Sequence, residues 1–147
     1  MKVRCLANVA TADQVKRYGL DPRVEHRYYV TPGKEYLVLA LTAVAGDSAY
    51  GPGVTVDVLD DFERWSIKPL FLFEVVDPRP SRYWLAKKVG EAELALWPES
   101  FFQDFYHDHL TDGVPDVVAD FKRVCGLLEA EYAEAADAQE WVPTSGR

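Results

Sequence analysis

The clearest pattern of apolar and polar positions predicts an amphipathic helix that begins at Pro115. Apolar side chains recur along one side of it, at a period of about 3.6 residues. They are Val117, Val118, Phe121, Val124, Cys125, Leu128 and Tyr132. An edge of the opposite side carries Asp116, Asp120, Leu127, Glu131 and Glu134. We expect the apolar side to pack on the rest of the domain and the acidic edge to face solvent.

A shorter helical segment precedes this helix. Pro98 suits the first turn of a helix, and Phe101, Phe105 and Tyr106 follow at helical spacing. The pattern predicts a helical turn or short helix through about Asp108, ended by the sequence Thr-Asp-Gly at 111–113. We predict that the three aromatic side chains face the core and that the neighbouring carboxylates face outward.

The first two-thirds of the chain favours strands. Val54–Leu59 alternates between two faces, and other segments are dense in β-branched and aromatic residues. The other strand candidates are Val24–Val30, Glu35–Val44, Pro69–Val76, Tyr83–Leu85 and Leu94–Trp97. Pro32 and Gly33 predict a turn between the first two strands, and the glycine-rich segment 46–53 predicts an exposed loop. Thr11–Gly19 has the cap residues of a short helix.

Strands followed by helices indicate an α+β fold rather than an alternating α/β fold. We expect a curved antiparallel sheet or partial barrel of five or six strands, packed by the C-terminal helices. Residues 1–147 are predicted to form a single domain, with about 136–147 as a frayed tail.

Composition excludes several classes of protein. The chain has 147 residues, of which 48% are hydrophobic, which is typical of a globular domain with a core. No segment approaches the roughly 20 apolar residues of a membrane span, and the first residues do not resemble a signal peptide, so we expect a cytoplasmic protein. Cys5 and Cys125 do not form a disulfide framework or a metal motif.

Negative charge is concentrated in the last third of the chain. Residues 91–147 hold 13 acidic and 3 basic side chains, while residues 1–90 hold 11 acidic and 13 basic ones. This charge disfavours direct binding of nucleic acid and favours a basic partner, although it serves solubility equally well.

No sequence motif supports catalysis. Ser48 lies in a glycine-rich segment, but Tyr50 stands where a nucleophile turn needs glycine. The segment His107–Asp108–His109 would place its two imidazoles on diverging sides of a helix, which argues for a solvated turn rather than a metal site. Carboxylate pairs are abundant, and general acid–base chemistry needs one of them buried. We predict no catalytic residue, no metal and no cofactor.

A protein-binding role has more support, because aromatic residues beside carboxylates combine anchors with charges that steer a basic partner. The predicted binding residues are Asp104, Asp108, Asp112, Asp116 and Asp120. Two alternatives remain. One is a small enzyme or ligand-binding domain with a pocket near Gly46–Gly53, and the other is a homodimeric module that uses an exposed sheet edge.

Two segments, LFEVVDPRPSRYW at Leu72–Trp84 and FYHDHLTDGVPDVVADFKR at Phe105–Arg123, resemble bacterial toxin-immunity proteins, in particular those of contact-dependent growth inhibition systems. The resemblance implies a protein that binds the C-terminal toxin domain of an exported effector and blocks it. Such toxins are often nucleases with a basic surface. The expected protein is a monomer alone and a 1:1 heterodimer with the toxin, without membrane or nucleic-acid partners.

Overall fold

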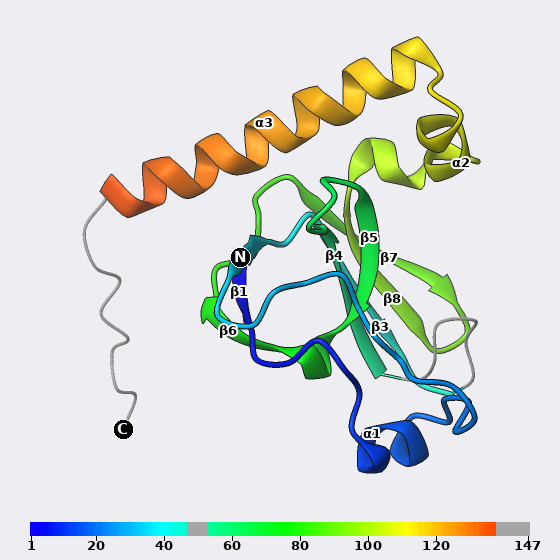
Figure 1. Ribbon diagram of the computed structural model, residues 1–147. Helices are drawn as coiled ribbons and strands as arrows, with labels where there is room; N and C mark the ends of the chain where they lie inside the picture. The colour runs from blue at the N-terminus through cyan, green and yellow to red at the C-terminus, as the bar shows by residue number, and fades with distance from the viewer. Residues whose placement is uncertain (47–52, 138–147) are drawn as a thin grey trace, which may run out of the picture.

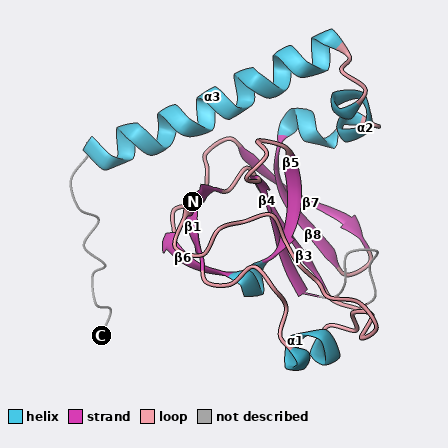
Figure 2. Cartoon of the chain, viewed as in Figure 1, coloured by secondary structure: helices cyan, strands magenta, loops and turns pink. Residues whose placement is uncertain are grey.

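The computed structural model describes residues 1–46 and 53–137, with side chains described through residue 134. It has two antiparallel sheets, and C-terminal helices cover them on one side (Figures 1 and 2). The predicted α+β class, with an antiparallel sheet packed by C-terminal helices, is confirmed. In the described part of the chain the strands number eight rather than five or six. They divide into a three-stranded and a five-stranded sheet.

The three-stranded sheet has the order β2-β1-β6. Its strands are β1 (Lys2–Cys5), β2 (Glu35–Leu37) and β6 (Phe73–Asp77). Side chains of β1 alternate, so Val3 is buried and Arg4 points outward. The Arg4 guanidinium bridges the two flanking strands through Glu35 at 3.1 Å and Glu74 at 2.7 Å.

The five-stranded sheet has the order β5-β4-β3-β8-β7. Its strands are β3 (Ala40–Val44), β4 (Gly53–Leu59), β5 (Trp65–Pro69), β7 (Trp84–Gly90) and β8 (Glu93–Pro98). The strands predicted at Val54–Leu59, Tyr83–Leu85 and Leu94–Trp97 are confirmed as β4, β7 and β8.

The apolar run Glu35–Val44 forms two strands instead of the single strand predicted. Its first part is β2 and its last part is β3, so the run passes from one sheet to the other. Val38 and Leu39 lie buried at the junction, and the Trp84 indole N–H donates to the Leu39 carbonyl at 2.9 Å. The run is nearly continuously apolar because Val38 packs in one cluster of buried residues while Leu39 and Ala40 pack in another.

Other local predictions have mixed outcomes. The strand predicted at Val24–Val30 is wrong: within this segment the only pairing is an isolated bridge between Arg27 and Val9. Pro69–Val76 is interrupted by a 3-10 turn, η1 (Leu70–Leu72), that separates β5 from β6. The turn after Thr31 is confirmed by the hydrogen bond from the Lys34 N–H to the Thr31 carbonyl at 3.0 Å.

The predicted N-terminal helix is confirmed as α1 (Ala12–Arg17). Thr11 accepts from the Gln14 backbone N–H, and the Gln14 side chain accepts from the Thr11 N–H. This capping box satisfies two backbone donors that the first helical turn leaves free.

Three helical elements follow β8. They are the 3-10 turn η2 (Glu99–Phe102), α2 (Tyr106–Thr111) and α3 (Pro115–Asp137). The break predicted at 111–113 and the start predicted at Pro115 are confirmed. In Figure 1, α3 crosses above the sheets and α2 lies at its N-terminal end.

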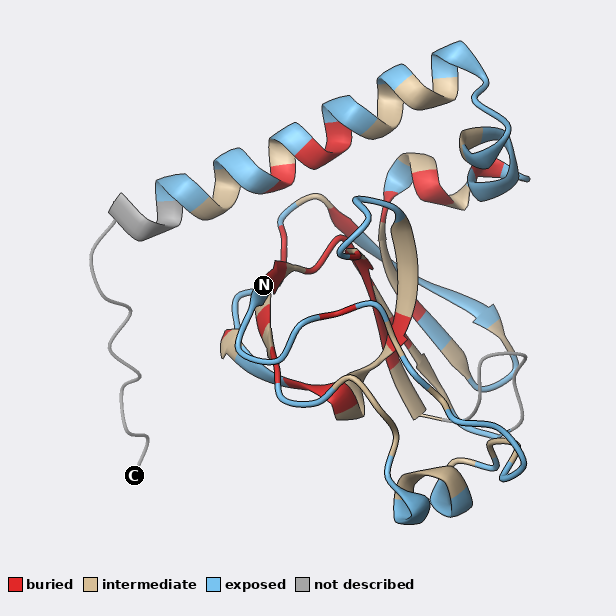
Figure 3. Cartoon of the chain, viewed as in Figure 1, coloured by how far each residue is buried: buried red, intermediate tan, exposed pale blue. Residues whose placement is uncertain are grey.

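The core has two parts. One part lies between the two sheets and includes Val3, Val38, Val56 and Leu72. The other part lies beneath α3, where the buried side chains Val124, Cys125 and Leu128 pack with Leu39, Ala40, Phe101 and Tyr106. Figure 3 shows the buried residues of α3 on the side that faces the sheets. The predicted apolar side of the last helix is therefore confirmed.

Two predictions fall on residues outside those described: most of the loop at 46–53, including Ser48, and the tail beyond residue 137. Among the helices that are described, none combines the length and hydropathy of a membrane span.

Candidate partner-binding surface

The prediction that Phe105 lies in the core is wrong. Its side chain is 70% exposed, while Phe101 and Tyr106 are only 4% and 3% exposed. The cause is the backbone of Phe105, which adopts a left-handed conformation with φ 59° and ψ 21° between η2 and α2. The helical period does not continue through that residue, so the sequence spacing misplaced its side chain.

Aromatic packing holds the neighbouring side chains inside. The Trp65 ring of β5 lies 4.5 Å from the Phe101 ring and stacks on Phe121 of α3 at 5.5 Å. The Tyr106 hydroxyl donates to the Asp120 carboxylate at 2.7 Å, which connects α2 to α3. Burial and this hydrogen bond raise the pKa of Tyr106 above its ordinary value.

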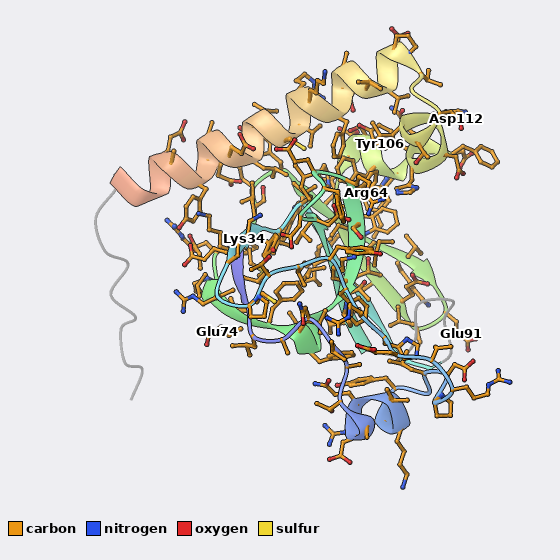
Figure 4. All side chains as sticks on the ribbon, viewed as in Figure 1. Lys34, Arg64, Glu74, Glu91, Tyr106 and Asp112 are labelled. Carbon is orange, nitrogen blue, oxygen red and sulfur yellow. The ribbon has the colours of Figure 1, made fainter. Side chains whose placement is uncertain are left out.

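Four of the five predicted carboxylates are exposed. Asp104 lies just before α2, Asp108 lies within it, Asp112 caps its C-terminus, and Asp116 is in the first turn of α3. Figure 4 shows Asp112 at the outer end of the helices and Tyr106 on their inner side. Within the described chain, none of the four has a cationic side chain within 4.0 Å.

Asp120 differs from the other four because its carboxylate is bound inside the protein. It accepts from Tyr106 and from the Arg123 guanidinium, both at 2.7 Å. Partial burial alone would raise the pKa of Asp120, but these hydrogen bonds outweigh burial and the pKa is lowered. Asp120 joins α2 to α3 and does not share the free exposure of the other four.

The C-terminal part of the predicted acidic edge of α3 contacts the loop before β7. The Glu131 carboxylate accepts from the Ser81 hydroxyl at 2.6 Å and the Arg82 backbone N–H at 2.8 Å. Glu134 lies 3.5 Å from the Arg82 guanidinium. These contacts hold α3 against the loop before β7. The prediction that the acidic edge faces solvent is therefore wrong for its C-terminal part.

Exposed apolar side chains occur in the same segment, 104–116, as the free carboxylates. Besides Phe105, Val114 is exposed in the turn between α2 and α3, and the His109 ring lies 6.3 Å from the Phe105 ring. We define the acidic surface as Asp104, Phe105, Asp108, Asp112, Val114 and Asp116. An exposed aromatic anchor surrounded by charge is typical of a protein interface.

Charge on this part of the chain is strongly one-sided. Residues 99–134 contain nine carboxylates and two basic side chains, a net charge of −7. Lys122 and Arg123 are those two, and Arg123 is already paired with Asp120. The acidic surface therefore presents a negative field to an approaching molecule.

Within the residues described, the imidazoles of His107 and His109 do not share one site. The His107 ring lies 4.8 Å from Trp65, whereas His109 lies beside Phe105, so the two imidazoles diverge as predicted. Among the described residues, no group of three or more His, Cys, Asp and Glu side chains could hold a metal. Burial raises the pKa of the Cys125 thiol to about 12, which disfavours a reactive thiolate.

Four acidic or basic side chains of the described residues, Asp57, Asp60, Lys68 and Asp77, are buried, which the sequence alone does not show. Asp57 of β4 accepts from the Trp65 indole N–H at 2.8 Å, and burial, partly offset by this bond, raises its pKa to about 7. Lys68 of β5 is also buried. Strand alternation placed Asp57 opposite the valines of β4 but could not show that both faces are covered.

A cavity of about 360 Å³ lies beside Gly53, where the alternative hypothesis placed a pocket near Gly46–Gly53. Gly53, Tyr18, Tyr28, Ile67 and Phe71 contribute to its wall, and its described lining contains no carboxylate or imidazole. Residues 47–52 lie outside the description. The ionisable side chains in its described lining are Tyr18 and Tyr28.

No protein-family model, curated protein or solved structure matches the chain.

Proposed function

We propose that this chain is a cytoplasmic immunity protein that binds and neutralises the basic C-terminal toxin domain, such as a nuclease, of an effector exported by its own cell. Two features support the proposal, and they share the segment that contains Phe105, Asp108, Asp112 and Asp116. Leu72–Trp84 and Phe105–Arg123 resemble immunity proteins of contact-dependent growth inhibition systems. The second feature is the acidic surface.

The observation that carries a binding role is the position of Phe105. Its ring is exposed on the segment 104–116, which also carries four exposed carboxylates without a basic partner in the described chain. Water-exposed phenylalanine contributes little to the stability of a free monomer. Burial of the ring against a partner would gain apolar contact, and the carboxylates would meet cationic side chains.

Charge complementarity explains how such binding would inhibit a nuclease. A nuclease needs cationic side chains where it holds the phosphate backbone. An acidic protein seated on those side chains would compete with nucleic acid for the same surface. The long-range field would also accelerate association, and added salt would slow it.

The test requires a candidate toxin domain, which we expect to be encoded in the neighbouring reading frame. The two purified proteins should form a 1:1 complex by size-exclusion chromatography with light scattering. Phe105→Ala should weaken the complex on the order of tenfold to a hundredfold, mainly through faster dissociation. Unchanged affinity would place the interface elsewhere.

A matched pair of double variants tests the electrostatic part. Asp108→Asn with Asp112→Asn should slow association by about tenfold at low ionic strength. Glu25→Gln with Glu91→Gln removes the same charge elsewhere, and Figure 4 shows Glu91 far from Asp112. If both double variants slow association equally, net charge rather than the acidic surface steers the partner. Absence of any complex would refute the proposed function.

A further inference from the structure

A groove of about 1020 Å³ is lined by residues of α2, α3, β5 and the turn that precedes β5. Its apolar lining includes Leu110, Val118 and the stacked pair Trp65 and Phe121. No residue of the acidic surface lines it. The volume matches that of sites for small organic ligands, which are mostly apolar with a few placed polar groups.

Lys68 provides a buried positive charge in this groove. The residue is 6% exposed, and its ammonium donates to the Ser66 hydroxyl oxygen at 2.6 Å. An ammonium has three donors, and in the described chain this is the only one with a protein acceptor. The Ser66 oxygen accepts from Lys68, so its own hydroxyl hydrogen remains available to a ligand.

The nearest carboxylates are already engaged. Asp60 accepts from the backbone N–H groups of Phe62 and Arg64 and from the Arg64 guanidinium. Asp61 accepts from the Tyr36 hydroxyl at 2.6 Å, from the Thr31 hydroxyl at 2.7 Å and from Lys34. Neither carboxylate lies within 4.0 Å of the Lys68 ammonium. Burial consequently lowers the pKa of Lys68 despite the attraction of Asp60.

The exposed rim of the groove carries charges of both signs. Lys122, Glu63 and Glu129 are exposed lining residues, whereas Lys68 is buried. Figure 4 shows Arg64 between the helices and β5. Gly126 of α3 also lines the groove, and a Cβ atom built there would meet no heavy atom within 4 Å. The groove thus combines space, apolar walls and an inner ammonium.

We infer that this groove binds an organic carboxylate with an apolar body. The carboxylate accepts from the Lys68 ammonium and the Ser66 hydroxyl, and the body packs against the apolar lining that α2 and α3 provide with Leu110 and Val118. A buried ammonium without a carboxylate partner is unfavourable, and a ligand carboxylate provides the missing charge. This site is separate from the acidic surface and does not depend on the proposed immunity function.

The direct test compares 4-phenylbutyrate with 4-phenylbutyramide, which has nearly the same shape and no charge. Calorimetry should show that the carboxylate binds at least about tenfold more tightly than the amide. In ¹⁵N-edited NMR spectra the carboxylate should perturb Ser66, Lys68 and the Trp65 indole. Equal binding of both compounds, or perturbation only at other residues, would overturn the inference.

Variants separate the charge from the shape of the groove. Lys68→Met keeps an apolar stem and should abolish the preference for carboxylate over amide, whereas Lys122→Met at the rim should retain it. Gly126→Leu should block both compounds, while Ala119→Leu, on an exposed position of α3, should not. A preference that survives Lys68→Met would refute the role of Lys68. The wild-type comparison remains decisive if Lys68→Met does not fold.

One further compound distinguishes the source of the carboxylate. N-acetylglutamate α-amide reproduces an acidic protein side chain without the aromatic body. We expect it to bind at least about tenfold more weakly than 4-phenylbutyrate, because it contacts less of the apolar wall. Equal affinity would overturn the assignment to a small organic acid and indicate an acidic side chain of a protein. The Asp108→Asn, Asp112→Asn variant should bind all three compounds unchanged.

Discussion

At the residue scale, Phe105 has an unusual backbone for its type. Only Phe105 and Glu63 have a positive φ among the non-glycine residues described. This conformation costs a bulky L-residue roughly 1–2 kcal/mol. The Phe105 ring is also exposed. Neither the backbone conformation nor the side chain of Phe105 therefore stabilises the free chain.

Replacement of Phe105 by glycine should therefore leave the free protein as stable or more stable. We expect Phe105→Gly to raise the free energy of unfolding by up to about 1 kcal/mol, measured by urea denaturation. Phe101→Ala, in the core, should lower it by about 3–5 kcal/mol. A large loss of stability in Phe105→Gly would show that the exposed ring supports the fold.

Glu63→Gly is the matched control for backbone strain, since Glu63 has φ 56°. It should give a similar stability change and leave the affinity for the basic partner unchanged. Only Phe105→Gly should change both properties. Equal loss of affinity in the two variants would mean that the relief of strain, rather than the lost ring, weakens binding.

Asp57 predicts an unusual dependence of stability on pH. Its pKa rises from 3.8 to about 7 on folding, because burial disfavours the charged carboxylate. Between about pH 4 and pH 7 the folded protein retains a proton that the unfolded chain has released. The contribution of Asp57 to stability therefore falls as pH rises through this window, and it stays low above it.

Asp57→Asn should remove this dependence while keeping an acceptor for the Trp65 indole. The unfolding free energy of the variant minus that of wild type should increase by roughly 2 kcal/mol as the pH is raised from about 4 to about 8. Urea denaturation of both proteins across that range measures the difference. A constant difference would mean that Asp57 is already ionised in the folded protein at low pH.

At the scale of elements, local sequence predicted well where one element determines its own pattern. Thr11 and Gln14 define the start of α1, and the apolar period of α3 extends from Val117 to Tyr132. These signals depend on neighbours within one helical turn. Phe105 shows their limit, since one left-handed residue ended the period without any glycine to mark it.

The pairing of strands in the two sheets could not be predicted from the local sequence. Val24–Val30 is rich in strand-forming residues but gains no neighbouring strand, while Lys2–Cys5 is short and lies between two. β5 was missed because Trp65–Pro69 is short, and its final proline is tolerated at the edge of a sheet. For the same reason, sequence placed five acids near one another but could not separate Asp120, which is bound to Tyr106, from the exposed four.

Gly126 permits a prediction for α3 as an element. Glycine inside a helix costs about 1 kcal/mol relative to alanine, and here a methyl group has space. Gly126→Ala should raise the unfolding free energy by about 0.5–1 kcal/mol in urea. Gly113→Ala should lower it instead, because Gly113 has φ 72°. Destabilisation by Gly126→Ala would show that the backbone there is not regular helix.

At the scale of the molecule, the segment Glu35–Val44 contributes one strand to each sheet, and its side chains pack in both parts of the core. Val38 belongs to the core between the sheets, while Leu39 belongs to the core beneath α3. Neither sheet can separate without exposing this segment. The packing therefore predicts that the sheets and α3 unfold together.

Coincident unfolding transitions would confirm this coupling. Tryptophan fluorescence reports on Trp65 beneath α3 and on Trp84 at the junction of the sheets, and far-UV circular dichroism reports on the backbone. We expect the same urea midpoint and slope from both signals. Two separated transitions would show that one part of the core is stable without the other.

The position of β1 has a consequence for synthesis of the chain on the ribosome. Arg4 contacts Glu35 and Glu74, which are 31 and 70 residues further along the sequence. Because β1 precedes both of its neighbours along the chain, its backbone is fully paired only after β6, about 70 residues later, has been synthesised. Until then Val3 and Cys5 remain exposed on a nascent chain, where early chaperone contact would protect them from aggregation.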